Sequence, residues 1–311
     1  MGRAHDERTG GRFVTFTIAN TLADVLAALA AGARPIAGGT DLVVGARQGK
    51  DSLPETLIAI DRVGELRTIE AADDHTRIGS GVTHSMLVSD PLIVEQFTAI
   101  ADAAALVGSP ATRNVGTIGG NVMNGSPAMD TGAPLVVLGA EAELSTTAGS
   151  RRVSLDELWV SPGRTSAQTD ELCTALVLPN PPDGAGSAYV RLEYRRAMEI
   201  AVVGAAAAVT LDGDVITAVR IALTAVAPTI LELADLSGLS GRAVDESFFA
   251  AVASAASEQA APISDLRASD RYRRHTIGVM ARRATEAAVR RAQGEVIDVP
   301  VNRALGVGAA S

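Results

Sequence analysis

The stretch "PIAGGTDL", Pro35 to Leu42, places a double glycine directly after a short apolar run, and a second double glycine lies in "TIGGN", Thr117 to Asn121. Glycine is costly in backbone entropy, so a glycine pair indicates a tight turn or a close approach of the backbone to another group. Each pair is flanked by a threonine and by an aspartate or asparagine, which can hydrogen-bond a ligand. Because backbone N–H groups in such loops bind phosphate, the two loops together predict a pyrophosphate site.

The bulk composition is that of a globular protein with a large core. A length of 311 residues predicts two or three domains. The hydrophobic share of 47% and the charged share of 20% are ordinary for a globular protein. Aromatic residues make up 3% of the chain and the formal net charge is −9, so we expect no nucleic-acid partner. Lys50 is the single lysine, so a bound anion would be held by backbone N–H groups or by a few arginines.

Cysteine and histidine content argues against a metal centre in this chain. Cys173 is the only cysteine, which excludes an internal disulfide and a cysteine-ligated iron–sulfur cluster. The four histidines are scattered, and we interpret His84 as a surface or turn residue. The start of the chain is polar, and the longest apolar run, Ile200 to Val209, is too short to cross a bilayer. We expect no membrane span and a cytoplasmic location.

Periodicity and capping signals predict helices and strands in the first half of the chain. Thr21 to Gly32 is a predicted helix with an N-cap threonine and a closing glycine. Another helix is predicted from Leu92 to Gly108, after Pro91. The remaining predictions are a short buried strand running into a glycine turn over 34–40, strands at 56–63 and 171–179, a strand leading into a helix at 76–90, a helix near 131–138 and hairpin strands after it.

The second half of the chain has a different sequence pattern. "PNPPDGAGS", residues 179–187, is a predicted linker. After it come three or four predicted strands, with a hairpin turn at Asp212-Gly213, and then helices. Strands followed by helices, without regular βαβ alternation, predict an α+β fold. Residues 1–11 are predicted to be a disordered tail and 293–311 a second tail.

Motifs of other enzyme classes are absent or incomplete. "GARQGKD", Gly45 to Asp51, is one residue short of a nucleotide-hydrolase phosphate loop and lacks its final Ser or Thr. The spacings G-x-G-x-x-G, H-E-x-x-H and G-x-S-x-G do not occur. We therefore name no catalytic side chain. An isolated glycine pair could be a simple turn, and that alternative stays open for each loop.

The two loops, read with the segments around them, resemble a known family. "AGGTDL", "TIGGNVMNGSPAMDTGAPLVVLGA", "GSAYVRLEYRRAMEIAVVGAAAAVTLDG", "ALTAVAPT" and "YRRHTIGVMARRA" are similar to the FAD-binding medium subunit of the xanthine dehydrogenase and carbon monoxide dehydrogenase family of molybdenum hydroxylases. The resemblance covers about residues 12 to 292. It implies an FAD-binding domain of the p-cresol methylhydroxylase/vanillyl-alcohol oxidase (PCMH/VAO) type over 12–180, in two subdomains of about 12–64 and 65–180. A smaller α+β domain of sheet plus helices would follow over 185–292.

The resemblance also implies the residues of the FAD site. Both glycine loops would close on the FAD pyrophosphate from opposite sides. Asp130 would hydrogen-bond a ribityl or ribose hydroxyl, or alternatively cap a helix. Val107 would lie beside the cofactor, the backbone of Leu172 and Cys173 would approach the isoalloxazine, and Arg191 would be a basic residue near the flavin or a charge on a strand surface. The loop residues are Pro35, Ile36, Ala37, Gly38, Gly39, Thr40, Asp41 and Leu42, with Thr117, Ile118, Gly119, Gly120 and Asn121.

An electron-transfer role follows from the resemblance. A molybdenum cofactor in a large subunit would oxidise the substrate, and [2Fe–2S] clusters in a small subunit would carry electrons to the FAD of this chain. NAD⁺, a quinone or oxygen would then accept them, in an assembly expected to be a dimer of heterotrimers. One alternative is a stand-alone FAD-dependent oxidoreductase of the same fold. Another is a scaffold subunit that has lost its flavin, against which the intact Gly38, Gly39, Gly119, Gly120 and Asp130 argue.

Overall fold

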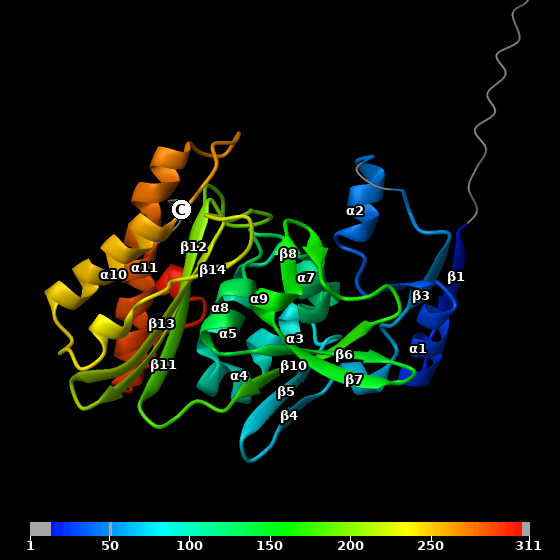
Figure 1. The fold of residues 1–311 in the computed structure, drawn as a ribbon, viewed down its shortest axis with the longest axis horizontal. Coiled ribbons are helices and arrows are strands. Elements are labelled where there is room, and N and C mark those ends of the chain that lie inside the picture. The colour runs from blue at the N-terminus through cyan, green and yellow to red at the C-terminus, as the bar shows by residue number, and fades with distance from the viewer. Residues whose placement is uncertain (1–13, 50–51, 307–311) are drawn as a thin grey trace, which may run out of the picture.

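The computed structural model describes residues 14–49 and 52–306, so the predicted tail at 1–11 lies outside the described residues. Three larger sheets and a small two-stranded one organise this part of the chain. The molecule is elongated, with the N-terminal sheet at one end, a five-stranded sheet in the middle and a four-stranded sheet at the other end (Figure 1).

The N-terminal sheet is small and parallel. Its elements are β1 (Thr15–Ile18), α1 (Leu22–Ala30), β2 (Arg34–Ile36), α2 (Leu42–Arg47), β3 (Thr56–Ala59) and the 3-10 helix η1 (Gly64–Leu66). The strand order is β1-β3-β2, and both outer strands run parallel to β3. The predicted helix is confirmed: the Thr21 hydroxyl accepts the Asp24 N–H at 3.2 Å, and the Asp24 carboxylate accepts the Thr21 N–H. The first glycine loop joins β2 to α2.

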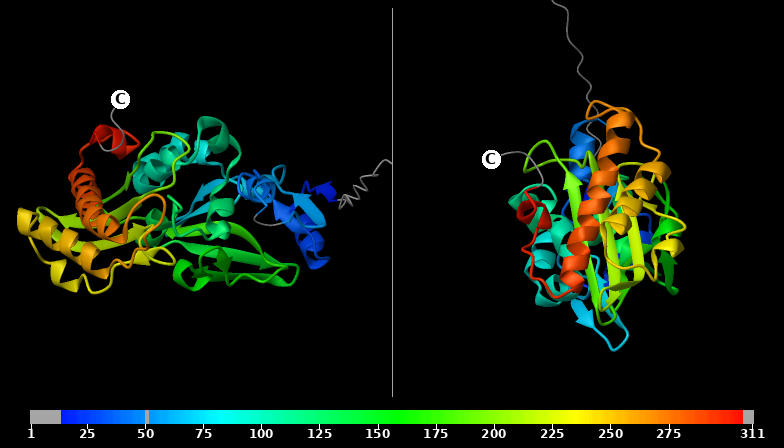
Figure 2. Two further views of the ribbon diagram at one scale, coloured as in Figure 1. Left: turned by 90° about the horizontal axis from the view of Figure 1, so that it is seen from above. Right: turned by 90° about the vertical axis from the view of Figure 1, so that its left-hand side faces the viewer.

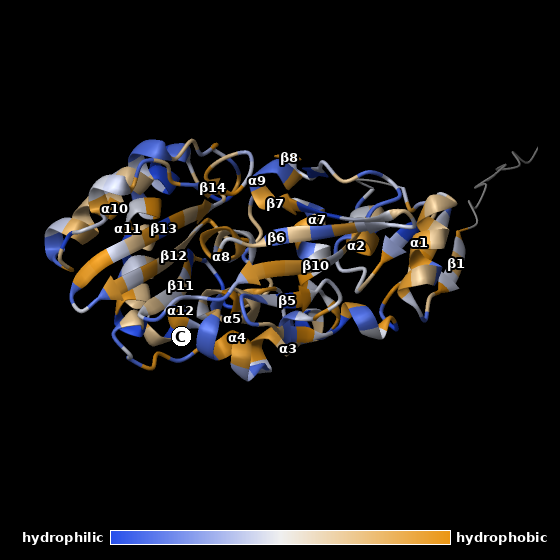
Figure 3. Ribbon diagram, turned by 60° about the horizontal axis from the view of Figure 1, so that its bottom comes forward, coloured by the Kyte–Doolittle hydropathy of each residue, from blue (hydrophilic) through white to orange (hydrophobic). Residues whose placement is uncertain are grey.

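The central sheet is antiparallel, in the order β4-β5-β10-β6-β7. Its strands are β4 (Ile69–Ala71), β5 (His75–Gly79), β6 (Glu141–Thr146), β7 (Gly149–Ser154) and β10 (Leu172–Pro179). The helices and the small sheet beside it are α3 (His84–Ser89), α4 (Pro91–Gln96), α5 (Thr98–Leu106), α6 (Pro110–Val115), α7 (Ile118–Asn124), α8 (Gly132–Val137), α9 (Leu155–Leu158), β8 (Trp159–Ser161) and β9 (Arg164–Thr165). β10 is largely hydrophobic, as Figure 3 shows. This composition fits its position, because neighbouring elements bury it from Leu172 to Leu178.

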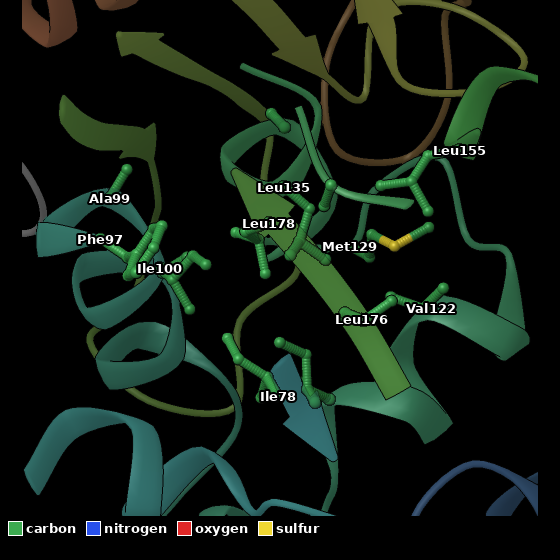
Figure 4. Packing of buried hydrophobic residues seen from close by; sticks show 14 of the residues in the cluster. Ile78, Phe97, Ala99, Ile100, Val122, Met129, Leu135, Leu155, Leu176 and Leu178 are labelled. Atoms are coloured by element: carbon green, nitrogen blue, oxygen red, sulfur yellow. The ribbon is translucent and has the colours of Figure 1, made fainter. Parts of the chain in front are cut away.

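The main core lies between this sheet and its helices. Ile78 of β5 and Leu176 of β10 meet Ile100 of α5 and Leu135 of α8 in one cluster (Figure 4). The single helix predicted from Leu92 to Gly108 is wrong, since the chain forms α4 and α5 with a break between them. Phe97 interrupts the helix at φ −120° and ψ 44° and is fully buried in the same cluster, so its packing fixes the bend.

The C-terminal sheet is covered on both faces. Its antiparallel strands are β11 (Ala185–Leu192), β12 (Val203–Asp212), β13 (Val215–Thr224) and β14 (Leu231–Glu232), followed by the 3-10 helix η2 (Ser237–Leu239), α10 (Glu246–Gln259), α11 (Asp270–Ala292) and α12 (Val301–Ala304). Ala205 and Ala207 point into the core formed with α10 and α11, whereas Ala206 points into the core shared with α5 and α8. Figure 2 shows α11 lying across the strands. The predicted hairpin is present, but its two loop residues are Gly213 and Asp214, one position later than predicted.

Two segments expected to be linker or tail are packed. Residues 185–187 of the predicted linker belong to β11, and Gly186 allows the strand to touch α11, since a Cβ there would lie 2.3 Å from the Ala288 carbonyl oxygen. Residues 293–306, predicted as tail, include α12, where Val301 and Asn302 are buried against β11. Buried backbone and side-chain hydrogen bonds hold this segment, so the tail prediction is wrong for the described residues.

The structure confirms the α+β class predicted from the sequence. No helix among the described residues is long and apolar enough to cross a membrane. The domain limits given above remain predictions, because the main core continues from Ile78 in the central sheet to Tyr189 and Ala222 in the C-terminal sheet.

Candidate functional site

The two glycine loops lie against each other. A Cβ added to Gly38 would lie 2.0 Å from the carbonyl oxygen of Val115, so the backbones touch at this point. Asn124 Nδ2 donates to Asp41 Oδ1 at 3.3 Å and ties the ends of the two loops together. The structure therefore brings together two segments that are about eighty positions apart in the sequence.

Residues 80–84, which lead from β5 into the first residue of α3, form a platform for the second loop. Gly119 N–H donates to the Ser80 carbonyl at 2.9 Å, Ile118 N–H to Val82 at 3.0 Å, and His84 N–H to Gly116 at 3.1 Å. The two segments thus run antiparallel, although they form no named strand pair. The Thr117 hydroxyl, at the N-cap of α7, accepts the Gly120 N–H at 3.1 Å.

The glycines of the two loops differ in whether the surrounding protein leaves room for a side chain. A Cβ on Gly119 would lie 2.4 Å from Ser80 Cβ, so Gly119, like Gly38, is required by packing within the protein. Gly39 has a φ of +66°, which glycine adopts without strain. Gly120 is exposed, and a Cβ there would meet only the Thr117 hydroxyl, at 3.1 Å. Of the glycines in these pairs, Gly120 is the one whose open side faces away from the protein, and so the one that a ligand could approach.

A cavity of about 300 Å³ opens between the loops. The first loop contributes Ala37 and Gly38, the platform contributes Thr83, and the second loop contributes Val115 and Thr117. This volume is at the lower end of the range of about 300–1,000 Å³ found for ligand cavities. Hydroxyl groups and glycine backbone around a space of this size fit the phosphates and one sugar of a dinucleotide.

Asp130 and Arg191 form a buried ion pair. Arg191 Nη1 donates to Asp130 Oδ2 at 2.7 Å, and its Nε donates to Glu193 Oε2 at 2.8 Å. Tyr189 Oη donates to the other oxygen of Asp130 at 2.9 Å. Burial, the largest single influence, lowers the pKa of Arg191, but Asp130, Tyr189 and Glu193 together outweigh it and hold this pKa above its ordinary value. The alternative that Arg191 is a charge on a strand surface is wrong, because its side chain is fully buried. The alternative that Asp130 caps a helix is also wrong, because Thr131 occupies the N-cap of α8.

A hydrogen bond from the residue after Asp130 reaches the second glycine loop. Thr131 Oγ1, next to Asp130, donates to Asn121 Oδ1 at 2.5 Å. Arg191 Nη2 is buried and has no partner among the described residues. An unpaired buried donor of this kind is uncommon in proteins and marks the cluster as a place where a further acceptor would be favourable.

The other predicted residues lie at the borders of the site. Val107 ends α5 and is half-buried, and its carbonyl accepts Arg113 Nη1 at 3.0 Å. Leu172 and Cys173 are buried at the start of β10, before its pairing with β5 begins at Ala175. Burial raises the pKa of the Cys173 thiol to about 12, so this side chain is no nucleophile at neutral pH.

The interpretation of His84 as a surface or turn residue is wrong. Its side chain is 2% exposed, lies beside Gly116 beneath the second loop, and leaves Nδ1 without a partner among the described residues. Burial, with a smaller contribution from the charge of Arg113, lowers its pKa from 6.5 to about 4. His84 is therefore neutral at physiological pH.

Sequence reasoning also missed the platform itself, with Ser80 and Thr83. The signal that could have revealed it is "GSG", Gly79 to Gly81, directly after a predicted strand. A Cβ on Gly79 would lie 2.4 Å from the Leu66 carbonyl oxygen, so this turn packs closely on the end of η1.

Comparison with known proteins identifies the family. The family model described as "FAD binding domain in molybdopterin dehydrogenase" matches residues 12–181, and "CO dehydrogenase flavoprotein C-terminal domain" matches 188–288. The chain belongs to the family of molybdopterin-dehydrogenase FAD-binding subunits. The expected family, the FAD cofactor and the assignment to the oxidoreductases are thereby confirmed.

Several relatives of this family align with almost the whole chain. The xanthine dehydrogenase FAD-binding subunit of Escherichia coli O157:H7 is 31% identical over 289 residues, which is 91% of this chain and 99% of that protein. The carbon monoxide dehydrogenase medium chain of Afipia carboxidovorans is 34% identical over 279 residues, 89% of this chain and 96% of that one. Among solved structures, carbon monoxide dehydrogenase from Hydrogenophaga pseudoflava has a TM-score of 0.84 at 30% identity, covering 89% of this chain and 97% of that chain.

Proposed function

We propose that this chain is the electron-transfer subunit of a molybdenum hydroxylase, and that it works with a large molybdenum-cofactor subunit and a small [2Fe–2S] subunit. In the proposal, electrons from the iron–sulfur clusters reach FAD on this chain and leave to NAD⁺, a quinone or oxygen. The observation that carries it is the cavity between two touching glycine loops, in a chain whose FAD-binding family is established. Bound FAD supplies the redox chemistry, and the chain supplies its position and electrostatic surroundings.

The glycine loops are proposed to hold the pyrophosphate. Pro35 to Leu42 and Thr117 to Asn121 would close on it from opposite sides of the cavity, as the contact of Gly38 with Val115 supports. The backbone N–H donors would come mainly from the first loop, after Pro35, because the N–H groups of residues 118–121 already donate within the protein. A net hydrogen bond to a charged group contributes about 1.5–3 kcal/mol. Several such bonds would retain a dinucleotide in a chain whose net charge is −9.

The buried ion pair is proposed to orient the flavin end of the cofactor. A carboxylate has about four lone-pair sites, and Tyr189 and Arg191 occupy two of those on Asp130, which leaves capacity for one cofactor hydroxyl. The proposal also keeps Arg191 near the flavin, Val107 as an apolar neighbour, and the backbone at Leu172 and Cys173 beside the isoalloxazine.

The described residues offer no constellation for chemistry on an organic substrate. No group of three or more His, Cys, Asp or Glu that could hold a metal occurs in the described part of the chain. The thiol of Cys173 is buried and protonated, and His84 has no access to solvent. This favours an electron-transfer subunit over the alternative, a stand-alone FAD-dependent oxidoreductase.

The test is to purify the native assembly through a tag on this chain, record its visible spectrum and identify the co-purifying chains. Flavin absorption together with a large molybdenum protein and a small iron–sulfur protein is the expected result. Flavin on a lone chain that oxidises an organic substrate would favour the stand-alone enzyme. A folded chain that neither contains nor takes up FAD would contradict both readings.

A further inference from the structure

The cavity between the glycine loops has a cationic wall that the loops themselves do not supply. Arg67, which follows η1, lines this cavity together with Gly38, Thr83 and Thr117. Among the lining residues in the described part of the chain, Arg67 is the one with a positive charge. We propose that Arg67 binds a phosphate of FAD in the cavity that the two glycine loops also line. The inference rests on the proposed FAD site and adds a residue to it.

The position of Arg67 is fixed by close backbone packing. Gly81 N–H donates to the Leu66 carbonyl at 2.7 Å, and Arg67 N–H donates to the Gly64 carbonyl at 2.9 Å. A Cβ on Gly81 would lie 3.3 Å from Arg67 Cγ and 3.0 Å from the Leu66 carbonyl oxygen. The glycine turn of the platform therefore makes room for the stem of Arg67 and directs its guanidinium along the cavity wall.

The guanidinium retains donors for a ligand. Arg67 Nη1 donates to the carbonyl oxygen of Asp61 at 3.0 Å, which uses one of its five N–H groups. Asp61 lines the same cavity, yet its carboxylate forms no ion pair with Arg67 among the described residues. The positive charge of Arg67 is thus available, and it offsets the repulsion that Asp61 exerts on an anion.

Phosphate is the chemistry that matches this wall. A guanidinium presents a planar fork of donors that fits two phosphate oxygens, and such charge-assisted hydrogen bonds are about twice as strong as neutral ones. Arg67 is exposed, so a ligand can reach it, whereas Arg191 is buried and forms an ion pair with Asp130. A dinucleotide with its pyrophosphate between the loops would carry its negative charge within this cavity.

The experiment compares FAD, riboflavin and ADP binding to the full chain after removal of its flavin. Arg67→Met keeps the apolar stem and removes the guanidinium, and Arg67→Lys keeps the charge without the fork. We expect Arg67→Met to raise the Kd for FAD about tenfold or more, while the Kd for riboflavin, which has no phosphate, stays within about twofold. The variant should also weaken ADP competition and flatten the dependence of FAD affinity on salt, and Arg67→Lys should recover part of the loss.

Arg62→Met is the matched control, because Arg62 is exposed nearby but does not line the cavity. Equal FAD affinity in the wild-type chain and in a folded Arg67→Met variant would overturn the inference and leave the proposed function standing. Equal losses for FAD and riboflavin would also overturn it, since they would indicate a general structural effect. A wild-type chain that binds no FAD would remove the proposed site and the inference together.

Discussion

Asn302 pairs with the backbone of Arg191 as a neighbouring strand would. Its Oδ1 accepts the Arg191 N–H at 3.0 Å, and its Nδ2 donates to the Arg191 carbonyl at 2.8 Å. Arg191 lies on β11, the outer strand of the C-terminal sheet, whose other side pairs with β12. Asp102 meets the same edge two residues earlier, where its Oδ2 accepts the Tyr189 N–H at 3.2 Å. Side chains from α5 and α12 thus bond backbone groups at the outer edge of β11. The same strand carries Tyr189 and Arg191, which donate to Asp130.

Replacing Asn302 by leucine should destabilise the chain strongly. The change leaves a buried N–H and a buried carbonyl of Arg191 unpaired, and each such group costs about 1–3 kcal/mol. We expect the free energy of unfolding to fall by about 2–5 kcal/mol in urea denaturation. Arg303→Ala, an exposed change at the next position, should stay within about 0.5 kcal/mol of the wild type. Similar free energies of unfolding for both variants would mean that Asn302 does not stabilise the edge of β11 through these hydrogen bonds.

The buried pair of Asp102 with Arg291 should behave as a coupled unit. Arg291 donates to both oxygens of Asp102, at 2.6 and 3.1 Å, and Val301 N–H donates to Oδ1 at 2.8 Å. Removing one partner of such a buried pair typically costs about 3–5 kcal/mol, because the other charge is left unpaired. We therefore expect Asp102→Leu alone to lose about that much, and the double variant with Arg291→Met to lose less than the sum of the single changes. Strict additivity in this double-mutant cycle would contradict the coupling.

Acid should destabilise the chain through His84. Its pKa is about 4 in the folded protein against 6.5 ordinarily, so the unfolded chain binds the proton first as the pH falls. The stability contributed by the neutral imidazole is complete above pH 6.5 and is lost between 6.5 and 4, by about 3 kcal/mol in total. Urea denaturation at several pH values in this window should show a smaller loss for His84→Leu than for the wild type. The same measurements on His275→Leu, a replacement of an exposed histidine on α11, serve as the comparison.

The glycines of the two loops should divide into two classes when replaced. Gly38→Ala and Gly119→Ala place a Cβ about 2 Å from backbone or side-chain atoms of the protein, so we expect both to lower stability. Gly120→Val should leave a folded chain, because its position is open, yet should abolish FAD retention by occupying the approach of the phosphate. Circular dichroism and the ratio of flavin to protein absorbance separate the two effects. A folded Gly120→Val chain with one FAD per protein would show that this loop is only a turn.

Local signals were sufficient to predict most elements from the sequence. The N-cap threonine of α1, Thr21, and the strand pattern of β10 depend on neighbours in the sequence, and both are present as predicted. The glycine loops could be recognised because their unusual composition is itself local. Phe97 was missed as a helix break because its burial in the central core, rather than its propensity, bends the chain.

Features that depend on distant partners could not be predicted in the same way. The burial of Arg191 follows from Asp130, 61 positions away, and that of His84 from the loop that covers it. Arg67 has no local signal of ligand binding, since its place on the cavity wall is set by the packing of Leu66 against Gly79 and Gly81. The packing of residues 293–306 cannot be predicted locally, because two contacts that hold this segment, with Asp102 and Arg191, reach far back along the chain.

The distance between Asn302 and Arg191 has a consequence for synthesis on the ribosome. The two residues are 111 positions apart. At about 5–20 residues per second, β11 therefore emerges roughly 6–20 seconds before the side chain that closes its edge. During that interval the nascent strand can pair with another polypeptide, as exposed strand edges do. A chain that terminates within α11 lacks Asn302, so the edge of its β11 stays open. We therefore expect such products to form aggregates rather than merely less stable monomers.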